Sequence, residues 1–401
     1  MPTDNMNTRI GELLKMLDEV DNSNRKMVKE IGKPMSKKEE TKKETKDDIV
    51  KVMSPSEIVK KLDETVIGHT EAKKQLATIF FKYSTERLNE NKLREMGKEL
   101  TKSNILLTGD SGTGKTYLIE TICQILGMDY ILINSANITS AGYKGGDIED
   151  ELKRLYDKCD GDPDRIKKSV VILDELDKLK ANSESNGADI NGSGAIKNIL
   201  KALEGIEVSV DKSFYGGKQI LNTKDVLFVG TGTFNGGNTD IEEIVRKRID
   251  VRGHKRAMGF FGENEYKEAV VNDRREIRKN ITPDDIIEYG FSEEMLGRFS
   301  LVINLLPLTK EDYVEIAKLE KNGFGEYEAL MELYGKKLTV KEEVYEYLAD
   351  NMMNKKTNAR ALKGMVDKAM MDIVYKMVDD NRRKNYTIDR AYMESVLEKA
   401  E

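Results

Sequence analysis

The chain has 401 residues, which at about 150 residues per domain is enough for two or three domains, each with its own core. Charged residues make up 34% of the sequence and leave a net charge of -6, so the basic surplus typical of nucleic-acid-binding proteins is absent. No apolar run is long enough to span a membrane, and two cysteines, Cys123 and Cys159, are too few for a disulfide framework or a four-cysteine zinc site.

Residues 1–53 are predicted to form a helix followed by a charged linker. Apolar residues recur at helical spacing at Ile10, Leu13, Leu14, Leu17 and Val20. Residues 36–48 are almost devoid of apolar side chains, which is typical of a solvated or disordered linker. The helix is either ordinary packed structure or a small docking element. Residues 1–9 are polar and lack a signal-peptide core, and with only two cysteines the simplest location is the cytoplasm, with reduced thiols.

From residue 54 to residue 307, helical patterns alternate with short apolar runs. These runs cover 104–107, 130–133, 170–173, 226–229 and 301–304. Such alternation predicts an α/β domain with a parallel sheet covered by helices on both faces. From 308 to 401 long helical patterns dominate, with short strand-like pieces at 338–340 and 386–388. This part is predicted to be a smaller, mainly helical C-terminal domain.

The segment after the first apolar run matches the phosphate-binding loop at every fixed position. Its residues are Gly109, Asp110, Ser111, Gly112, Thr113, Gly114, Lys115 and Thr116. Glycines let the backbone N–H groups surround a phosphate, and the N-terminus of the following helix favours the anion. Lys115 is expected to contact the outer phosphates of ATP, and the Thr116 hydroxyl to ligate Mg²⁺. The alternative is a glycine-rich turn before a helix, which the Lys-Thr pair makes improbable.

Two carboxylates follow the third apolar run, at the end of a strand where ligands bind in such sheets. Asp174 is expected to hold Mg²⁺, and Glu175 to polarise the attacking water as a general base. The alternative is a pair of acids that cap a helix. Asp177, further along, is interpreted as a cap or a solvated residue.

Together with several further segments in matching order, these motifs resemble the AAA+ ATPases, and within them the ClpX family of protein unfoldases, over most of residues 54–378. Val66 and Ile67, followed by Gly68, resemble the segment that packs on adenine. Thr231 falls where the family carries its first sensor, with Thr233 and Asn235 as competing candidates.

Two arginines acquire roles through the same resemblance. Arg298, in a Gly-Arg-Phe sequence, resembles the arginine finger that reaches the ATP of the neighbouring subunit. Arg360 resembles the second sensor, which contacts the phosphates from a helix of the small domain. Taken alone, each would most often be a surface arginine.

Two loops resemble the family's substrate and partner contacts. Tyr143, between Gly142 and Lys144, resembles the aromatic residue of the first pore loop, although the family usually has an aliphatic residue at the position of Lys144. A second pore loop is expected within residues 209–218, without assigned residues. Met258, Gly259 and Phe260 resemble the tripeptide that docks on a ClpP-type peptidase, where the family usually has isoleucine in place of Met258.

The resemblance implies an ATPase that assembles as a hexamer and threads unfolded or tagged proteins, passing them to a ClpP-type peptidase. The family's four-cysteine zinc-binding N-terminal domain has no counterpart in this sequence. The alternatives are a stand-alone remodelling chaperone, a nucleic-acid motor or loader of the same fold, and a nucleotide-gated scaffold without turnover. The acidic net charge and Tyr143 argue against the nucleic-acid motor.

Overall fold

A computed structural model describes residues 52–98, 102–138, 148–179, 190–211, 218–236, 240–256, 273–319, 323–354, 360–380 and 382–397. The predicted N-terminal helix, Tyr143 and the tripeptide from Met258 to Phe260 lie outside these ranges.

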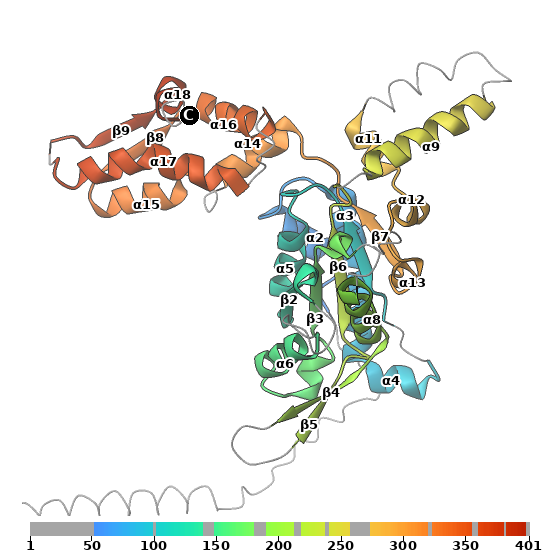
Figure 1. Cartoon of the computed structure of the whole chain (residues 1–401). Helices are drawn as coiled ribbons and strands as arrows, with labels where there is room; N and C mark the ends of the chain where they lie inside the picture. Colours follow the sequence, from blue (N-terminus) through green and yellow to red (C-terminus); the bar gives the residue numbers. More distant parts are fainter. Residues whose placement is uncertain are drawn as a thin grey trace, which may run out of the picture. The chain divides into compact units, whose positions relative to one another are not determined.

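The centre of the fold is a parallel sheet of five strands in the order β2-β3-β6-β1-β7. Its strands are β1 (Ile105–Thr108), β2 (Tyr130–Asn134), β3 (Val170–Asp174), β6 (Leu227–Gly232) and β7 (Leu301–Asn304). All five apolar runs form strands, as the sequence predicts, and the α/β fold class is confirmed. Figure 1 shows the strands β2, β3, β6 and β7 among the helices that flank them.

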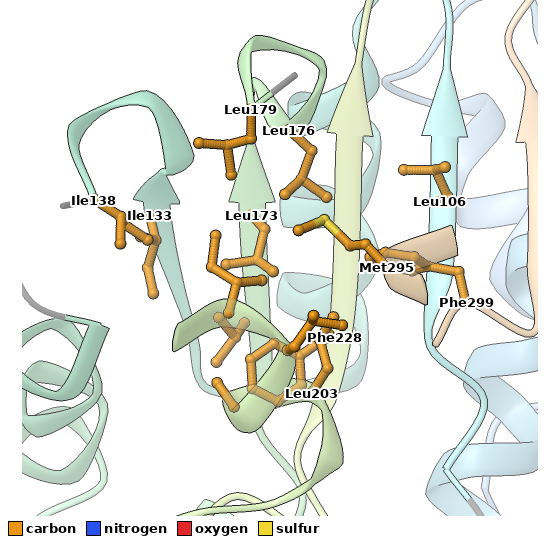
Figure 2. Packing of buried hydrophobic residues seen from close by; sticks show 14 of the residues in the cluster. Leu106, Ile133, Ile138, Leu173, Leu176, Leu179, Leu203, Phe228, Met295 and Phe299 are labelled. Carbon is orange, nitrogen blue, oxygen red and sulfur yellow. The ribbon is translucent and has the colours of Figure 1, made fainter. Parts of the chain in front are cut away.

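Both faces of the sheet are buried, which explains why its strands read as continuous apolar runs. Successive side chains of a strand point to opposite faces, so Leu106 joins one core cluster while Ile105 and Leu107 join another. Figure 2 shows Leu106, Leu173 and Phe228, from three strands, in the first of these clusters with Met295 and Phe299.

One face is covered by α2 (Pro55–Asp63), α3 (Thr70–Leu88) and α5 (Lys115–Leu126). The other is covered by α6 (Ile148–Lys158), α8 (Ile190–Glu204), α9 (Ile241–Arg256), α11 (Arg274–Lys279), α12 (Pro283–Glu288) and α13 (Glu293–Leu296). The shorter helices are α4 (Glu90–Glu95), α7 (Pro163–Ile166), η1 (Ser135–Asn137) and η2 (Leu176–Lys178). The start of α2 is fixed by a capping box, in which Ser54 and Glu57 each bond the other's backbone N–H.

An antiparallel hairpin, which the sequence analysis did not predict, lies between α8 and β6. It consists of β4 (Glu207–Asp211) and β5 (Lys218–Asn222). Polar and apolar residues alternate in β4, and β5 has only two adjacent apolar residues, Ile220 and Leu221, so neither strand contains the continuous apolar run by which the sheet strands were recognised. The segment expected to hold the second pore loop spans the facing ends of these strands. Residues 212–217 lie outside the described residues.

The C-terminal part has its own hydrophobic cluster. Its elements are α14 (Lys310–Lys318), α15 (Gly325–Leu333), β8 (Lys337–Val340), α16 (Glu342–Asn354), α17 (Arg360–Met377), β9 (Asn385–Ile388) and α18 (Arg390–Leu397). The two strand-like pieces pair in parallel, with Leu338 opposite Tyr386. The C-terminal region is mainly helical, as predicted. The proposed domain limits at residues 53 and 307 stay predictions. No helix in the described ranges is both long and apolar enough to cross a membrane.

Candidate active site

The predicted phosphate loop joins the end of β1 to the start of α5. Gly114 adopts a left-handed conformation with φ of 86°, immediately before the first residue of α5. At Gly109, a Cβ atom would lie 2.9 Å from the Cβ of Leu305, so a side chain would collide with the segment after β7. The two glycines let the loop turn tightly at the N-terminus of a helix of twelve residues, which is suited to binding phosphate.

Lys115 is held by carbonyl oxygens of this loop. Its Nζ donates to the carbonyl oxygens of Gly109 at 2.7 Å and Asp110 at 2.9 Å. Burial lowers the pKa of Lys115 to about 8, although the negative charges of Asp174 and Asp177 oppose this shift. The ammonium group therefore lies at the loop where phosphate oxygens would bind.

The register of the sheet brings the predicted metal ligands together. Thr116 at the start of α5 donates its hydroxyl to Asp174 Oδ2 at 3.4 Å, and Thr231 of β6 donates its hydroxyl to Asp174 Oδ1. Mg²⁺ prefers oxygen ligands and is usually held by one or two carboxylates with substrate phosphates. The hydroxyl of Thr116 and the carboxylate of Asp174 fit this ion. The described residues contain no group of three or more acidic, histidine or cysteine side chains that could hold a metal without such phosphates.

Glu175 lies in a conformation that is unusual for its residue type. Its φ is 57°, and its backbone N–H donates to Asp174 Oδ1 at 3.0 Å. Non-glycine residues in this region are strained, and such strain is concentrated at functional sites. Asn134, at the end of the adjacent strand β2, donates its Nδ2 to Glu175 Oε2 at 3.3 Å. The sequence analysis missed Asn134, although a polar residue closing a neighbouring strand was a usable signal.

These groups border one cavity of about 460 Å³. Its walls include Lys115, Thr116, Asp174, Glu175 and Thr233. The structure thus gathers the phosphate loop and the two carboxylates, which the sequence places about 60 positions apart, around a space into which phosphate groups fit.

The three candidates for the first sensor have different partners. Thr231 is buried and bonds Asp174, whereas Thr233 donates its hydroxyl to Asp177 Oδ2 at 2.9 Å. Asn235 donates its Nδ2 to Asp110 Oδ1 at 3.2 Å. The interpretation of Asp177 as a cap or solvated residue is wrong. Its side chain is buried and also accepts the backbone N–H of Phe234, because the turn after β3 folds it under the segment that follows β6.

Val66 and Ile67, predicted to pack on adenine, are found at the edges of two hydrophobic clusters. Val66 belongs to the cluster around α2, α3 and α5, and Ile67 packs against the C-terminal cluster. Neither borders the cavity of 460 Å³, so their contact with the base stays a prediction. The sequence analysis missed His69, whose Nε2 lies 2.8 Å from the Thr113 carbonyl oxygen. Burial lowers the pKa of His69, although this hydrogen bond opposes the shift.

The structure describes the side chain of only one of the two arginines that were predicted to act as the arginine finger and as the second sensor. Arg298 is half-exposed and forms an ion pair with Glu204 at the end of α8, and it does not border the cavity of its own chain. Exposed pairs of this kind contribute little to stability. Arg360 is the first residue of α17, and its side chain lies outside the described part of the chain.

Comparison with known proteins identifies the family of the domain that contains this site. Residues 105–256 match the model of the ATPase family associated with various cellular activities (AAA). These residues include the phosphate loop, both carboxylates and Thr231. The fold and the site therefore define an AAA ATPase, an enzyme that binds and hydrolyses ATP.

Relatives define the family more closely. The chain is 31% identical over 347 residues to the ATP-dependent Clp protease ATP-binding subunit ClpX of Azotobacter vinelandii, covering 84% of this chain and 77% of that protein. It is 32% identical over 366 residues to the protein of the same name from Bacteroides thetaiotaomicron, covering 89% and 84%. The chain belongs to the ClpX family.

Proposed function

We propose that this chain is an ATP-dependent protein unfoldase that works as a hexameric ring and delivers its substrates to a ClpP-type peptidase. The observation that carries the proposal is the similarity to ClpX over most of both chains, together with the lysine, threonine and two carboxylates of the predicted site around one cavity. The relatives are named as ATP-binding subunits of an ATP-dependent Clp protease.

The predicted hydrolytic side chains at and beside the cavity have separate roles in this proposal. Lys115 binds the outer phosphates, while Thr116 and Asp174 hold Mg²⁺, which would neutralise charge that develops on those phosphates. Glu175, oriented by Asn134, accepts a proton from the attacking water. Thr231 holds the Asp174 carboxylate in place.

Two arginines complete the hydrolytic site from other positions. Arg298 does not border the cavity of about 460 Å³ in its own chain, which supports a role at the ATP of the next subunit. Arg360 senses the phosphates from α17, and Val66 and Ile67 contact the adenine. The ring arrangement follows because each site needs an arginine from a neighbour.

Two proposed contacts take no part in ATP hydrolysis. Tyr143 contacts the substrate, and the tripeptide Met258, Gly259 and Phe260 contacts the peptidase. Tyr143 grips the polypeptide in the ring, because a large aromatic side chain contacts any sequence through apolar area. The tripeptide enters the peptidase. This assignment distinguishes a protease subunit from a stand-alone chaperone.

The test combines the chain, a ClpP-type peptidase and a folded, tagged fluorescent protein with ATP. Loss of fluorescence together with peptide release supports the full proposal. Loss of fluorescence without peptide release identifies a stand-alone unfoldase. If fluorescence stays constant while double-stranded DNA raises the ATPase rate, the proposal is wrong and the nucleic-acid motor is favoured. Glu175→Gln serves as the matched control without hydrolysis.

A further inference from the structure

A group of ion pairs around one buried arginine lies directly behind the phosphate loop. The side chain of Arg278, on α11, is fully buried. Its Nη2 donates to Asp110 Oδ1 at 2.7 Å, and its Nε donates to Glu242 Oε1 on α9 at 2.8 Å. Its Nη1 donates to the carbonyl oxygen of Thr233 at 3.2 Å. One guanidinium therefore joins the phosphate loop, α9 and the segment after β6.

Asp110 connects this arginine to the catalytic lysine. The carboxylate oxygen that Arg278 contacts also accepts from Asn235 at 3.2 Å and from Arg274 at 3.0 Å. The main-chain carbonyl of Asp110 accepts from Lys115 at 2.9 Å. Because side chain and carbonyl belong to one residue, a change in the anchoring of Asp110 shifts the groups that hold Lys115.

Charge balance gives the contact a second effect. Asp110 and Glu242 face Arg274 and Arg278, so two negative charges are matched by two positive charges. Burial opposes the ionisation of Glu242, but the hydrogen bond from Arg274 and the charge of Arg278 outweigh it and lower the pKa of Glu242. Without Arg278, the group carries a net negative charge beside the loop that must accept phosphates.

Another arginine, on α9, provides a comparison for the role of Arg278. Arg248 of α9 binds both oxygens of Asp285 in α12, with distances of 2.7 and 3.0 Å, and also binds the carbonyl oxygen of Asn280. None of these partners belongs to the phosphate loop or borders the cavity. Arg248 therefore has the packing role of a buried ion pair, and Arg278 has a packing role together with a direct contact to the loop.

We propose that Arg278 is a positioning residue for ATP binding and hydrolysis, which fixes Asp110 and neutralises its charge so that the phosphate loop keeps the geometry required for phosphate. Arg278 acts through Asp110 and does not touch ATP. The inference rests on the proposed role of residues 109–116 as the phosphate loop.

The test measures the Kd of a fluorescent ATP analogue and the kcat and KM of the ATPase for Arg278→Gln, Asp110→Asn, the double variant and the control Arg248→Gln. We expect Arg278→Gln to raise Kd and KM on the order of 10-fold, because Asp110 and Glu242 then share the single positive charge of Arg274 and one negative charge beside the phosphates is no longer balanced. In the double variant Arg274 and Glu242 still balance, so the Kd should return to within about 3-fold of the unmodified chain.

The control separates positioning from stability. Arg248→Gln should lower the melting temperature of the nucleotide-free protein and leave the Kd unchanged. A folded Arg278→Gln variant with unaltered Kd overturns the inference. It is also overturned if the double variant binds as weakly as Arg278→Gln, because relief by Asp110→Asn is the property that a packing role lacks.

Two further variants test the inference if Arg278→Gln does not fold, and test the phosphate loop separately from Arg278. If Arg278→Gln does not fold, Arg278→Lys replaces it, since a lysine keeps the charge but lacks the planar guanidinium with which Arg278 contacts Asp110, Glu242 and the Thr233 carbonyl oxygen at once. Its Kd should be raised, and Asp110→Asn should relieve the defect; an unchanged Kd counts against the inference. Lys115→Ala tests the phosphate loop itself. If Lys115→Ala binds ATP normally, the proposed loop is wrong, whatever Arg278 does.

Discussion

At the scale of single residues, Glu175 is the side chain on which hydrolysis is proposed to depend most directly. Its backbone is held at a positive φ and its carboxylate receives a hydrogen bond from Asn134. The left-handed backbone turns this residue away from the line of β3 and into the cavity wall that also contains Lys115. Asp174, one residue earlier, stays in the strand and bonds Thr116 and Thr231.

Glu175→Gln should bind ATP with nearly unchanged affinity and hydrolyse it about 10²-fold more slowly or worse, because a positioned general base is lost while Lys115 and the loop remain. Single-turnover hydrolysis and binding of a fluorescent ATP analogue measure the two effects separately. Near-normal turnover would show that Glu175 is not the base.

At the scale of secondary-structure elements, Tyr83 ties α3 to the sheet. Its buried hydroxyl lies 2.6 Å from the carbonyl oxygen of Lys167, 3.1 Å from that of Ser169 and 3.0 Å from that of Asp225. These carbonyl groups belong to the turns that precede β3 and β6. They lie at the amino-terminal ends of these strands, whereas the cavity lies at the carboxyl-terminal ends. Arg87, one turn later on α3, adds an ion pair to Asp225 at 2.9 Å.

Tyr83→Phe should lower the free energy of unfolding by about 1–2 kcal/mol, because buried carbonyl oxygens lose their donor. For a domain of this size that corresponds to a melting temperature lower by roughly 2–4 °C per kcal/mol. Thermal unfolding measures the shift. Tyr375→Phe is the matched control, since Tyr375 is 79% exposed. Equal melting temperatures for both variants would contradict the bracing role of Tyr83.

The elements themselves could largely be predicted from the sequence. All five sheet strands appear as continuous apolar runs because helices cover both faces of the sheet. The hairpin of β4 and β5 was missed, since β4 alternates between polar and apolar residues, β5 has only two adjacent apolar residues, and both strands contain charged ones. Strands of five residues with such sequences cannot be recognised from local pattern. Their pairing in the tertiary structure identifies them.

At the scale of the whole molecule, each ATP site of the proposed ring contains residues from two neighbouring subunits. Arg298→Ala should keep ATP binding and abolish ATPase activity, because the arginine is proposed to stabilise transition-state charge in the neighbouring subunit. Mixing Arg298→Ala with Glu175→Gln chains should restore part of the activity, since some interfaces then contain both functional residues. Steady-state ATPase rates over a series of mixing ratios measure this. Mixed rings without any regained activity would show that Arg298 does not act in trans.

Tyr143→Ala should keep substantial ATPase activity and lose the unfolding of stable substrates. A tyrosine buries roughly 150–250 Å² on contact, whereas alanine offers little grip. A folded domain is held by about 5–15 kcal/mol, so a weakened contact should slip before the domain yields. Fluorescence loss of a stable tagged domain, compared with an unfolded version at equal ATPase rate, is the measurement. Wild-type unfolding per ATP would contradict the pore-loop assignment.

The sequence by itself determined the α/β class and placed the phosphate loop and the two carboxylates. These features are encoded in contiguous residues, so local pattern and spacing are sufficient to find them. Only the tertiary structure could decide the rest of the site. Arg278 contacts Asp110 across 168 positions of sequence, and His69 contacts the Thr113 carbonyl across 44. Such partners depend on strand register and helix packing, which the sequence does not show. The sequence around Arg278 is that of an ordinary charged helix, and only the folded structure shows that the side chain of Arg278 is buried behind the loop.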